Sequence, residues 1–129
     1  MTRSRYRVAV SEEDRKKADL AIQIVALRFG VSVGAINRDA RLSPDALRAR
    51  RVAMYLAYVS FDWQQERVAH AFGVNRQTTA TACRKIEDAR ENAELNDLLD
   101  ELEGAIHAII GTSGGGVPAI GGTGTTEAA

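Results

Sequence analysis

The chain has 129 residues, enough for one domain; 45% of them are hydrophobic and only 5% are aromatic. A core rich in Ala, Val, Leu and Ile is therefore expected. No run of about 18 apolar residues occurs, which excludes a membrane-spanning helix. No apolar segment follows the basic first residues, so no secretory signal is expected. The single cysteine, Cys83, cannot form an internal disulfide, and we expect a soluble, cytoplasmic protein.

The formal net charge is zero, which argues against a strongly basic nucleic-acid binder, but the charge is unevenly distributed. Residues 1–60 carry twelve Lys and Arg and six Asp and Glu, whereas residues 61–93 carry five of each. Residues 94–129 carry six acids and no base. This gradient predicts that one face of the molecule could meet phosphate groups and that another could not.

Three regions are expected along the chain. Residues 1–10 form a flexible basic arm that could enter a DNA minor groove, although a disordered terminus is the simpler interpretation. Residues 11–110 are expected to fold as an all-α domain of five or six helices. Residues 111–129 hold seven of the eleven glycines and are predicted to be disordered, because they cannot bury enough surface to offset their ordering entropy.

The first half of the domain contains three predicted helices. Ser11 is expected to cap a helix that Gly30 ends, and residues 32–37 follow as a short second helix. Residues 37–42 form a basic loop. Ser43 and Pro44 are a strong start signal for a third helix, because Pro suits the first helical position. Residues 52–59 of that helix carry no charge on any side, which predicts a buried central helix.

The second half is predicted to hold three more helices. The first runs from about Trp63 to Phe72, and the next runs from near Asn75 to about Asn92. The last is expected from about Glu94 to Ile110. Its apolar residues recur at helical spacing and form one stripe, made up of Leu95, Leu98, Leu99, Leu102 and Ile106.

Residues 63–92 carry the pattern of a helix-turn-helix. Gly73 would provide the tight turn, Val74 would fill the angle between the helices, and Asn75 would cap the second helix. On that second helix, small and apolar residues fall on one side: Thr79, Ala82, Cys83, Ile86 and Ala89. Polar residues fall on the other: Gln77, Thr81, Arg84 and Asp88, flanked by Arg76 and Lys85. This division is typical of a DNA recognition helix, although similar helix pairs occur in proteins that never contact DNA.

The polar residue types suit DNA. Arg pairs with guanine and Asn or Gln with adenine, while Arg84 and Lys85, two turns further on, could reach phosphate. Asn75 by itself is a better candidate for a helix cap than for a base reader. The complete set of predicted DNA-binding residues is Arg48, Arg50, Arg51, Asn75, Arg76, Gln77, Thr78, Thr81, Arg84 and Lys85.

These residues lie in a region, from about Leu20 to Arg90, that resembles the C-terminal DNA-binding domain (domain IV) of the bacterial replication initiator DnaA. The run IVALRFGVSVGAI is similar to the family's first two helices, and RARRVAMYLA to its basic loop and central helix. The runs HAFG and TTATACRKIE are similar to the second half of its helix-turn-helix. The resemblance implies an all-α fold and binding to double-stranded DNA.

Two departures from the family affect function. No phosphate-binding Gly-x-x-x-x-Gly-Lys-Ser/Thr loop occurs, so we expect neither nucleotide binding nor ATP hydrolysis. The family's Gly-Gly-Arg-Asp-His-Ser/Thr-Thr-Val signature is replaced, and the chain is one residue shorter at the Gly73 turn. The resemblance places Arg48 and Arg50 where the family grips the DNA backbone and minor groove. The residues that would grip the DNA are thus retained, whereas those that would read bases are changed. This predicts recognition of a different DNA sequence.

Two functions are compatible with these observations. The chain could be a stand-alone DNA-binding module that regulates replication initiation, or transcription at related sites, in the nucleoid. Alternatively, it could have lost box recognition and act through protein contacts with the initiator or a factor that inactivates it. No metal or cofactor is expected, because His70 and His107 lie far from Cys83 in sequence. Paired acids such as Asp100 and Glu101 are expected to be a solvated helix face, so we predict no enzymatic activity.

Overall fold

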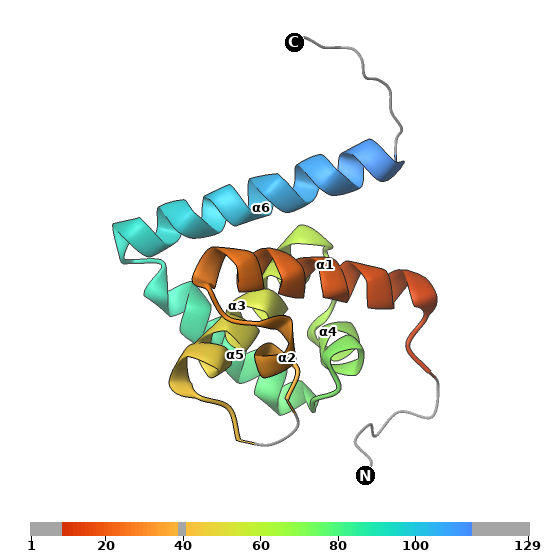
Figure 1. The fold of residues 1–129 in the computed structure, drawn as a ribbon, viewed down its shortest axis with the longest axis horizontal. Coiled ribbons are helices and arrows are strands. Elements are labelled where there is room, and N and C mark those ends of the chain that lie inside the picture. The colour runs from red at the N-terminus through yellow and green to blue at the C-terminus, as the bar shows by residue number, and fades with distance from the viewer. Residues whose placement is uncertain (1–8, 39–40, 115–129) are drawn as a thin grey trace, which may run out of the picture.

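A computed structural model describes residues 9–38 and 41–114, and six helices make up this part of the chain. They are α1 (Glu12–Phe29), α2 (Val33–Ile36), α3 (Pro44–Ser60), α4 (Gln65–Phe72), α5 (Arg76–Ala89) and α6 (Ala93–Gly114) (Figure 1). The all-α fold predicted from the sequence is confirmed. The arm over residues 1–8 and the tail over residues 115–129 lie outside the described residues.

Local side-chain signals fix most helix ends. Ser11, Ser43 and Asn75 each accept a hydrogen bond from the backbone N–H three residues later, at 3.1, 3.2 and 2.7 Å respectively. These bonds satisfy N–H groups that have no partner within the helix. Gly30 and Gly73 end α1 and α4 in the left-handed region, with φ of 69° and 70°, which glycine adopts without steric cost. The predicted caps are therefore confirmed.

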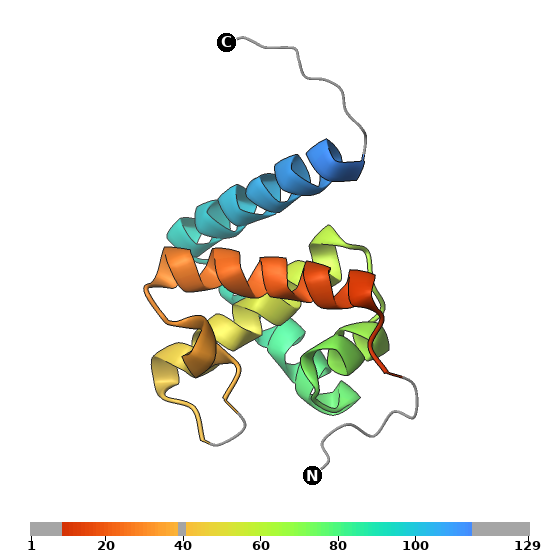
Figure 2. The same ribbon diagram turned by 45° about the vertical axis from the view of Figure 1, so that its right-hand side comes forward.

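Helix α3 is the centre of the fold, and α1, α5 and α6 pack around it (Figures 1 and 2). Eight of its residues are fully or almost fully buried: Ala46, Ala49, Val52, Ala53, Met54, Tyr55, Leu56 and Ala57. Many contact residues are alanines, which let the helices approach closely. The charge-free stretch of the sequence thus corresponds to the buried central helix, although Val59 at its end is 36% exposed.

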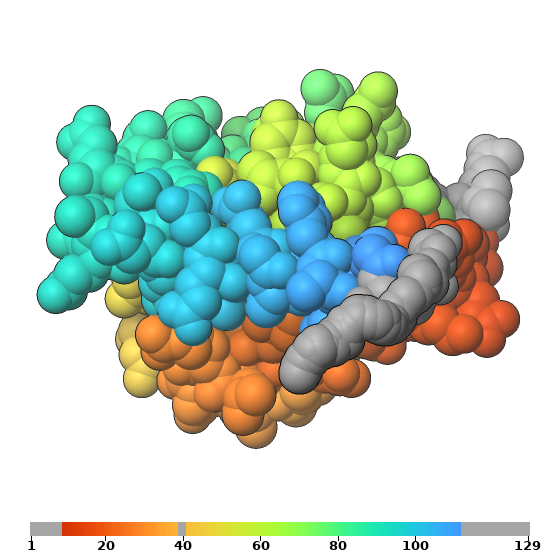
Figure 3. All heavy atoms as spheres, turned by 90° about the horizontal axis from the view of Figure 1, so that it is seen from above, coloured from red at the N-terminus to blue at the C-terminus, as the bar shows by residue number. Residues whose placement is uncertain are grey.

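A second buried cluster attaches α4 and α5 to the centre. It consists of Ala18, Met54, Ala57, Trp63, Val68, Ala71 and Ala82, contributed by α1, α3, α4, α5 and the turn before α4. On the other side of the core, α6 lies across α1 and α3 (Figure 3). Leu95, Leu99, Leu102 and Ile106 are its buried residues. Helix α6 therefore covers the side of α1 and α3 away from the turn between α4 and α5 (Figures 1 and 2).

Two predicted boundaries are wrong. Helix α5 ends at Ala89 rather than near Asn92, because Asn92 instead caps α6 by accepting a bond from the N–H of Leu95 at 3.0 Å. Helix α6 continues to Gly114, four residues beyond the predicted end at Ile110, so the first part of the predicted tail is helical. No helix among the described residues is both long and apolar enough to cross a membrane.

Candidate nucleic-acid interface

The helix-turn-helix is formed by α4, the Gly73 turn and α5. Val68 and Ala69 of α4 are fully buried, and Val74 packs against the second core cluster between the two helices. The N–H of Val74 donates to the carbonyl of Ala69 at 3.0 Å, which closes the turn. The α4–α5 pair therefore packs against α3, with the beginning of α5 next to the turn.

Helix α5 has one buried and one exposed face, as its sequence predicts. Thr79, Ala82, Cys83 and Ile86 are buried, and the Thr79 hydroxyl donates to the Met54 sulfur at 3.9 Å. The sequence predicts Ala89 on the buried side, but the structure exposes it, because the buried residues of α5 end at Ile86. The opposite side presents the predicted polar residues to solvent: Gln77, Arg84 and Asp88 are exposed, and Thr81 is half-buried.

The first turns of α3 and α5 meet in a shallow hollow of about 270 Å³. Its polar lining comes from two arginines of α3 and four residues at the start of α5: Arg50, Arg51, Asn75, Gln77, Thr78 and Thr81. Leu47, Met54 and Ala82 supply the apolar lining. Six of the ten predicted DNA-binding residues thus converge on one place, and they combine two guanidinium groups with uncharged hydrogen-bonding side chains.

Arg48 lies apart from this hollow. Two residues along an α-helix correspond to a rotation of about 200°, so Arg48 and Arg50 cannot share one face of α3. The Arg48 guanidinium lies 5.9 Å from the centre of the Phe29 ring, and it lines a separate hollow with Ala89 and Glu94. The two arginines that the resemblance assigns to the DNA backbone and minor groove therefore lie on different faces of α3.

The other predicted residues flank the hollow. Arg76 lies on the α4 side of α5, in a groove of about 650 Å³ shared with Trp63 and Glu66. Arg84 lines a neighbouring groove with Tyr55 and Glu87. Lys85 is exposed on α5. The side-chain oxygen of Asn75 accepts the capping bond from Thr78, so this residue serves the helix end first.

Cys83 is a free cysteine on the buried face of α5. Burial raises the pKa of Cys83 to about 11, and the nearby charge of Glu87 adds to the shift, so the thiol stays protonated at neutral pH. Within the described residues, no group of three or more His, Cys, Asp or Glu side chains is placed to hold a metal ion.

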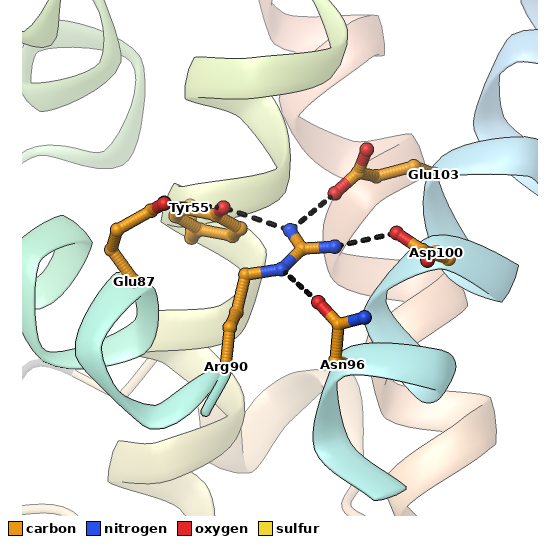
Figure 4. Close-up of polar contacts among 6 residues, drawn as sticks. All are labelled: Tyr55, Glu87, Arg90, Asn96, Asp100 and Glu103. Carbon is orange, nitrogen blue, oxygen red and sulfur yellow. Dashed lines mark hydrogen bonds and ion pairs between the residues drawn. The ribbon is translucent and has the colours of Figure 1, made fainter. Parts of the chain in front are cut away.

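Sequence reasoning missed a polar cluster at the far end of α5. Arg90 donates to Tyr55, Asn96 and Glu103 at 2.7–2.8 Å and pairs with Asp100 (Figure 4). The Tyr55 hydroxyl in turn donates to Glu87 at 2.7 Å. Burial, reinforced by this bond to Glu87, raises the pKa of Tyr55 to about 12. One sequence feature could indicate this cluster: Arg90 is the last Lys or Arg of the chain, and only Asp and Glu carry formal charge after it.

A second missed contact joins α4 to α1. Arg67 makes two hydrogen bonds, at 3.0 and 2.8 Å, to the carboxylate of Asp14, and its guanidinium lies 4.7 Å from the centre of the Trp63 ring. The hydrogen bonds from Arg67 lower the pKa of Asp14. This pair holds the outer helix of the helix-turn-helix against the beginning of α1.

Comparison with known proteins supports the resemblance. No protein-family profile matches the chain, and no curated protein matches its sequence. A solved structure described as a DNA replication initiation factor superposes with a TM-score of 0.67 and 26% sequence identity over 76% of this chain. That protein is the initiator DnaA. The chain is similar to the C-terminal domain of DnaA.

The similarity concerns one part of the initiator, since the chain spans 30% of the length of the solved protein. Within this DnaA-like fold, α5 is uninterrupted from Arg76 to Ala89 and includes the CRKI run. A residue missing inside the helix would rotate all following side chains by about 100°. The buried positions Ala82, Cys83 and Ile86 keep helical register, so the one-residue shortening is best placed in the turn at Gly73.

Proposed function

We propose that the chain is a double-stranded DNA-binding module, without catalytic activity, that controls replication initiation or transcription at related sites. Helix α5 would enter the major groove, and the beginning of α3 would lie against the backbone. The similarity in fold to a DNA replication initiation factor supports a role in replication initiation. The polar outer face of α5 supports the placement of this helix in the major groove.

The convergence of Arg50 and Arg51 with the beginning of α5 is the observation that carries this proposal. Guanidinium groups bind phosphate oxygens, and neighbouring Gln and Thr side chains can bond to base edges or phosphates. DNA recognition needs both kinds of contact within one surface. Arg50 and Arg51 would position the module, whereas Gln77 and Thr81 on the outer side of α5 would contact bases.

The position of α6 supports the same orientation. Its outer residues Glu94, Asp97, Asp100 and Glu101 are exposed, and phosphates would repel them. Because α6 lies on the side of α1 and α3 away from the turn between α4 and α5, these charges lie away from the beginning of α5 (Figures 1 and 2). The net charge of zero is therefore compatible with DNA binding on one face.

A fluorescence-anisotropy titration with a random-sequence duplex of about 20 base pairs tests the proposal. At physiological salt we expect non-specific binding with Kd on the order of 10⁻⁴–10⁻⁶ M that weakens as salt rises. Changing Arg50 and Arg51 to Ala should weaken binding to all sequences, and the log–log salt slope should decrease by about 1 for each arginine. Arg28→Ala, which removes an arginine near α6, is the matched control. Absence of binding even at low salt would contradict the proposal.

Selection from random DNA tests specificity. Because Asn75, Arg76 and Gln77 stand where the resemblance aligns Asp, His and Ser/Thr, we expect a site different from the family's box. Two mismatched readers would cost about 2–6 kcal/mol against that box. Tight, selective binding to the family's box would refute this expectation. Weak, equal binding to every duplex would favour the alternative function, in which the chain acts through the initiator or a factor that inactivates it.

A further inference from the structure

Arg90 occupies an unusual position in the fold. It follows the last residue of the recognition helix α5, and its side chain is only 18% exposed. Its hydrogen bonds reach both α3 and α6: the Tyr55 hydroxyl lies on α3, and Asn96, Asp100 and Glu103 lie on α6 (Figure 4). One guanidinium therefore joins the end of α5 to two other helices.

Helix α6 is held in place by its own apolar contacts and by a helix cap. Leu99 and Ile106 are fully buried, and Leu95 and Leu102 are nearly so, against α1 and α3. Asn92 caps its first turn. The acceptors that α6 offers to Arg90 are therefore fixed relative to the central helix α3, and they form a stationary anchor for the end of α5.

Helix α5 contributes mainly small side chains to its contact with α3. The buried residues of α5 are Thr79, Ala82, Cys83 and Ile86, and among them Ile86 alone is large. Small side chains interdigitate little, so this surface resists tilting of α5 less than a surface of large side chains would. The directional bonds of Arg90 supply the constraint that the apolar contact lacks.

The length of α5 amplifies any tilt. Gln77 precedes Arg90 by thirteen residues, which at 1.5 Å per residue is about 20 Å along the helix. A pivot of about 5° at the Arg90 end would move the beginning of α5 by roughly 2 Å. Hydrogen bonds to base edges need heavy-atom distances of about 2.7–3.2 Å, so such a movement would break them. Longer-ranged attraction to phosphates would change little.

We propose that Arg90 is a positioning residue for DNA recognition: by joining α5 to the anchored α6, it holds the recognition helix at one tilt. This inference rests on the proposed function. It predicts that Arg90 governs discrimination between DNA sequences and leaves general affinity for DNA almost unchanged.

The test compares Arg90→Ala with Arg28→Ala. Arg28 contacts Glu101 of α6 at 3.9 Å, so the control removes an arginine contact to α6 that does not involve α5. Each variant is titrated, well below its unfolding temperature, with the site selected from random DNA and with a scrambled duplex. For Arg90→Ala we expect the ratio of the two affinities to fall about tenfold or more, the scale of one lost base contact, with an unchanged salt slope. Arg28→Ala should preserve the ratio.

A second arm needs no DNA. Amide hydrogen exchange of Arg90→Ala should be faster over α5 than in the unaltered protein, and it should be unchanged over the first half of α1. If Arg90→Ala does not fold, Asn96→Ala removes one acceptor while keeping the arginine, and a smaller change in the same direction is expected. Arg90→Lys should not restore the ratio, because one ammonium cannot reproduce the planar set of bonds.

The outcomes separate the two proposals. If the unaltered protein binds no duplex, the proposed function fails, and the exchange measurement still decides whether Arg90 restrains α5. An equal loss of affinity for both duplexes, or an unchanged ratio with unchanged exchange over α5, would overturn the positioning role.

Discussion

The two ends of α5 are built differently. Its first turn is capped by the neighbouring Asn75 and presents Gln77 and Thr78 to solvent. Beyond its last turn, Arg90 is bound to α3 and α6 and is largely buried (Figure 4). The comparison shows a helix that is anchored at one end and presented at the other. Under the proposed function, the exposed beginning of α5 meets DNA, while Arg90 fixes the opposite end of the helix.

The largest expected effect comes from weakening the anchor. Leu99 of α6 is fully buried, so Leu99→Ala removes buried methyl groups and leaves a cavity. We expect the free energy of unfolding, measured by urea denaturation, to fall by about 2–5 kcal/mol. Leu27 is 86% exposed, and Leu27→Ala should change the free energy of unfolding by less than about 0.5 kcal/mol. Equal effects of the two substitutions would show that α6 is not anchored by its apolar stripe.

The second-largest effect on the free energy of unfolding is expected at alkaline pH, through Tyr55 at the anchored end of α5. Tyr55 keeps its proton up to a pKa of about 12 in the folded protein but loses it near 10 in the unfolded chain. The folded state therefore binds this proton more tightly, and the resulting stability is lost as pH rises from 10 to 12. The loss should reach about 2–3 kcal/mol. The stability difference between the unaltered protein and Tyr55→Phe should shrink over this range. A constant difference would contradict the assignment.

The turn that leads into the presented end should tolerate alanine poorly. Gly73 has a φ of 70°, although no atom lies within 4 Å of where a Cβ would be. The cost of Gly73→Ala is therefore backbone strain alone, about 1–2 kcal/mol. Gly104→Ala, inside α6 and equally unhindered, should instead stabilise the protein by about 0.5–1 kcal/mol. Thermal unfolding distinguishes the two, and stabilisation by Gly73→Ala would mean that the turn adopts another conformation.

The smallest effect on stability is expected at the beginning of α5. Asn75→Ala removes the capping bond to Thr78 and should cost about 1 kcal/mol, whereas Asn75→Asp should retain the cap. Because the side-chain oxygen is engaged in the cap, we expect Asn75→Ala to leave the selected DNA sequence unchanged. A changed sequence preference in selection from random DNA would make Asn75 a base reader.

Short-range signals made much of this fold predictable. The caps at Ser11, Ser43 and Asn75, the glycine at 73 and the apolar stripe of α6 depend on neighbours a few residues away, and the structure contains all of them. The initiator-like fold was also predictable, because the motifs of the family's domain occur in the family's order.

The features that could not be predicted depend mostly on contacts between residues far apart in the sequence. The Arg90 cluster joins residues up to 35 positions apart, which no local pattern reveals. The grouping of Arg50 and Arg51 with the beginning of α5 depends on how α3 packs against α5, which the sequence does not reveal. The predicted end of α5 was wrong for a local reason, because Asn92 can either end one helix or cap the next.

The central claim is that the beginning of α5 and the first turns of α3 form the DNA-binding face, while α6 serves as the anchor on the other side. An amide NMR titration with a random-sequence duplex, at salt low enough for binding, tests it most directly. The account predicts that shift changes concentrate on Arg50, Arg51 and residues 75–85 and that residues 94–106 of α6 remain unaffected. Shift changes centred on α6, or spread evenly over the described residues, would contradict it.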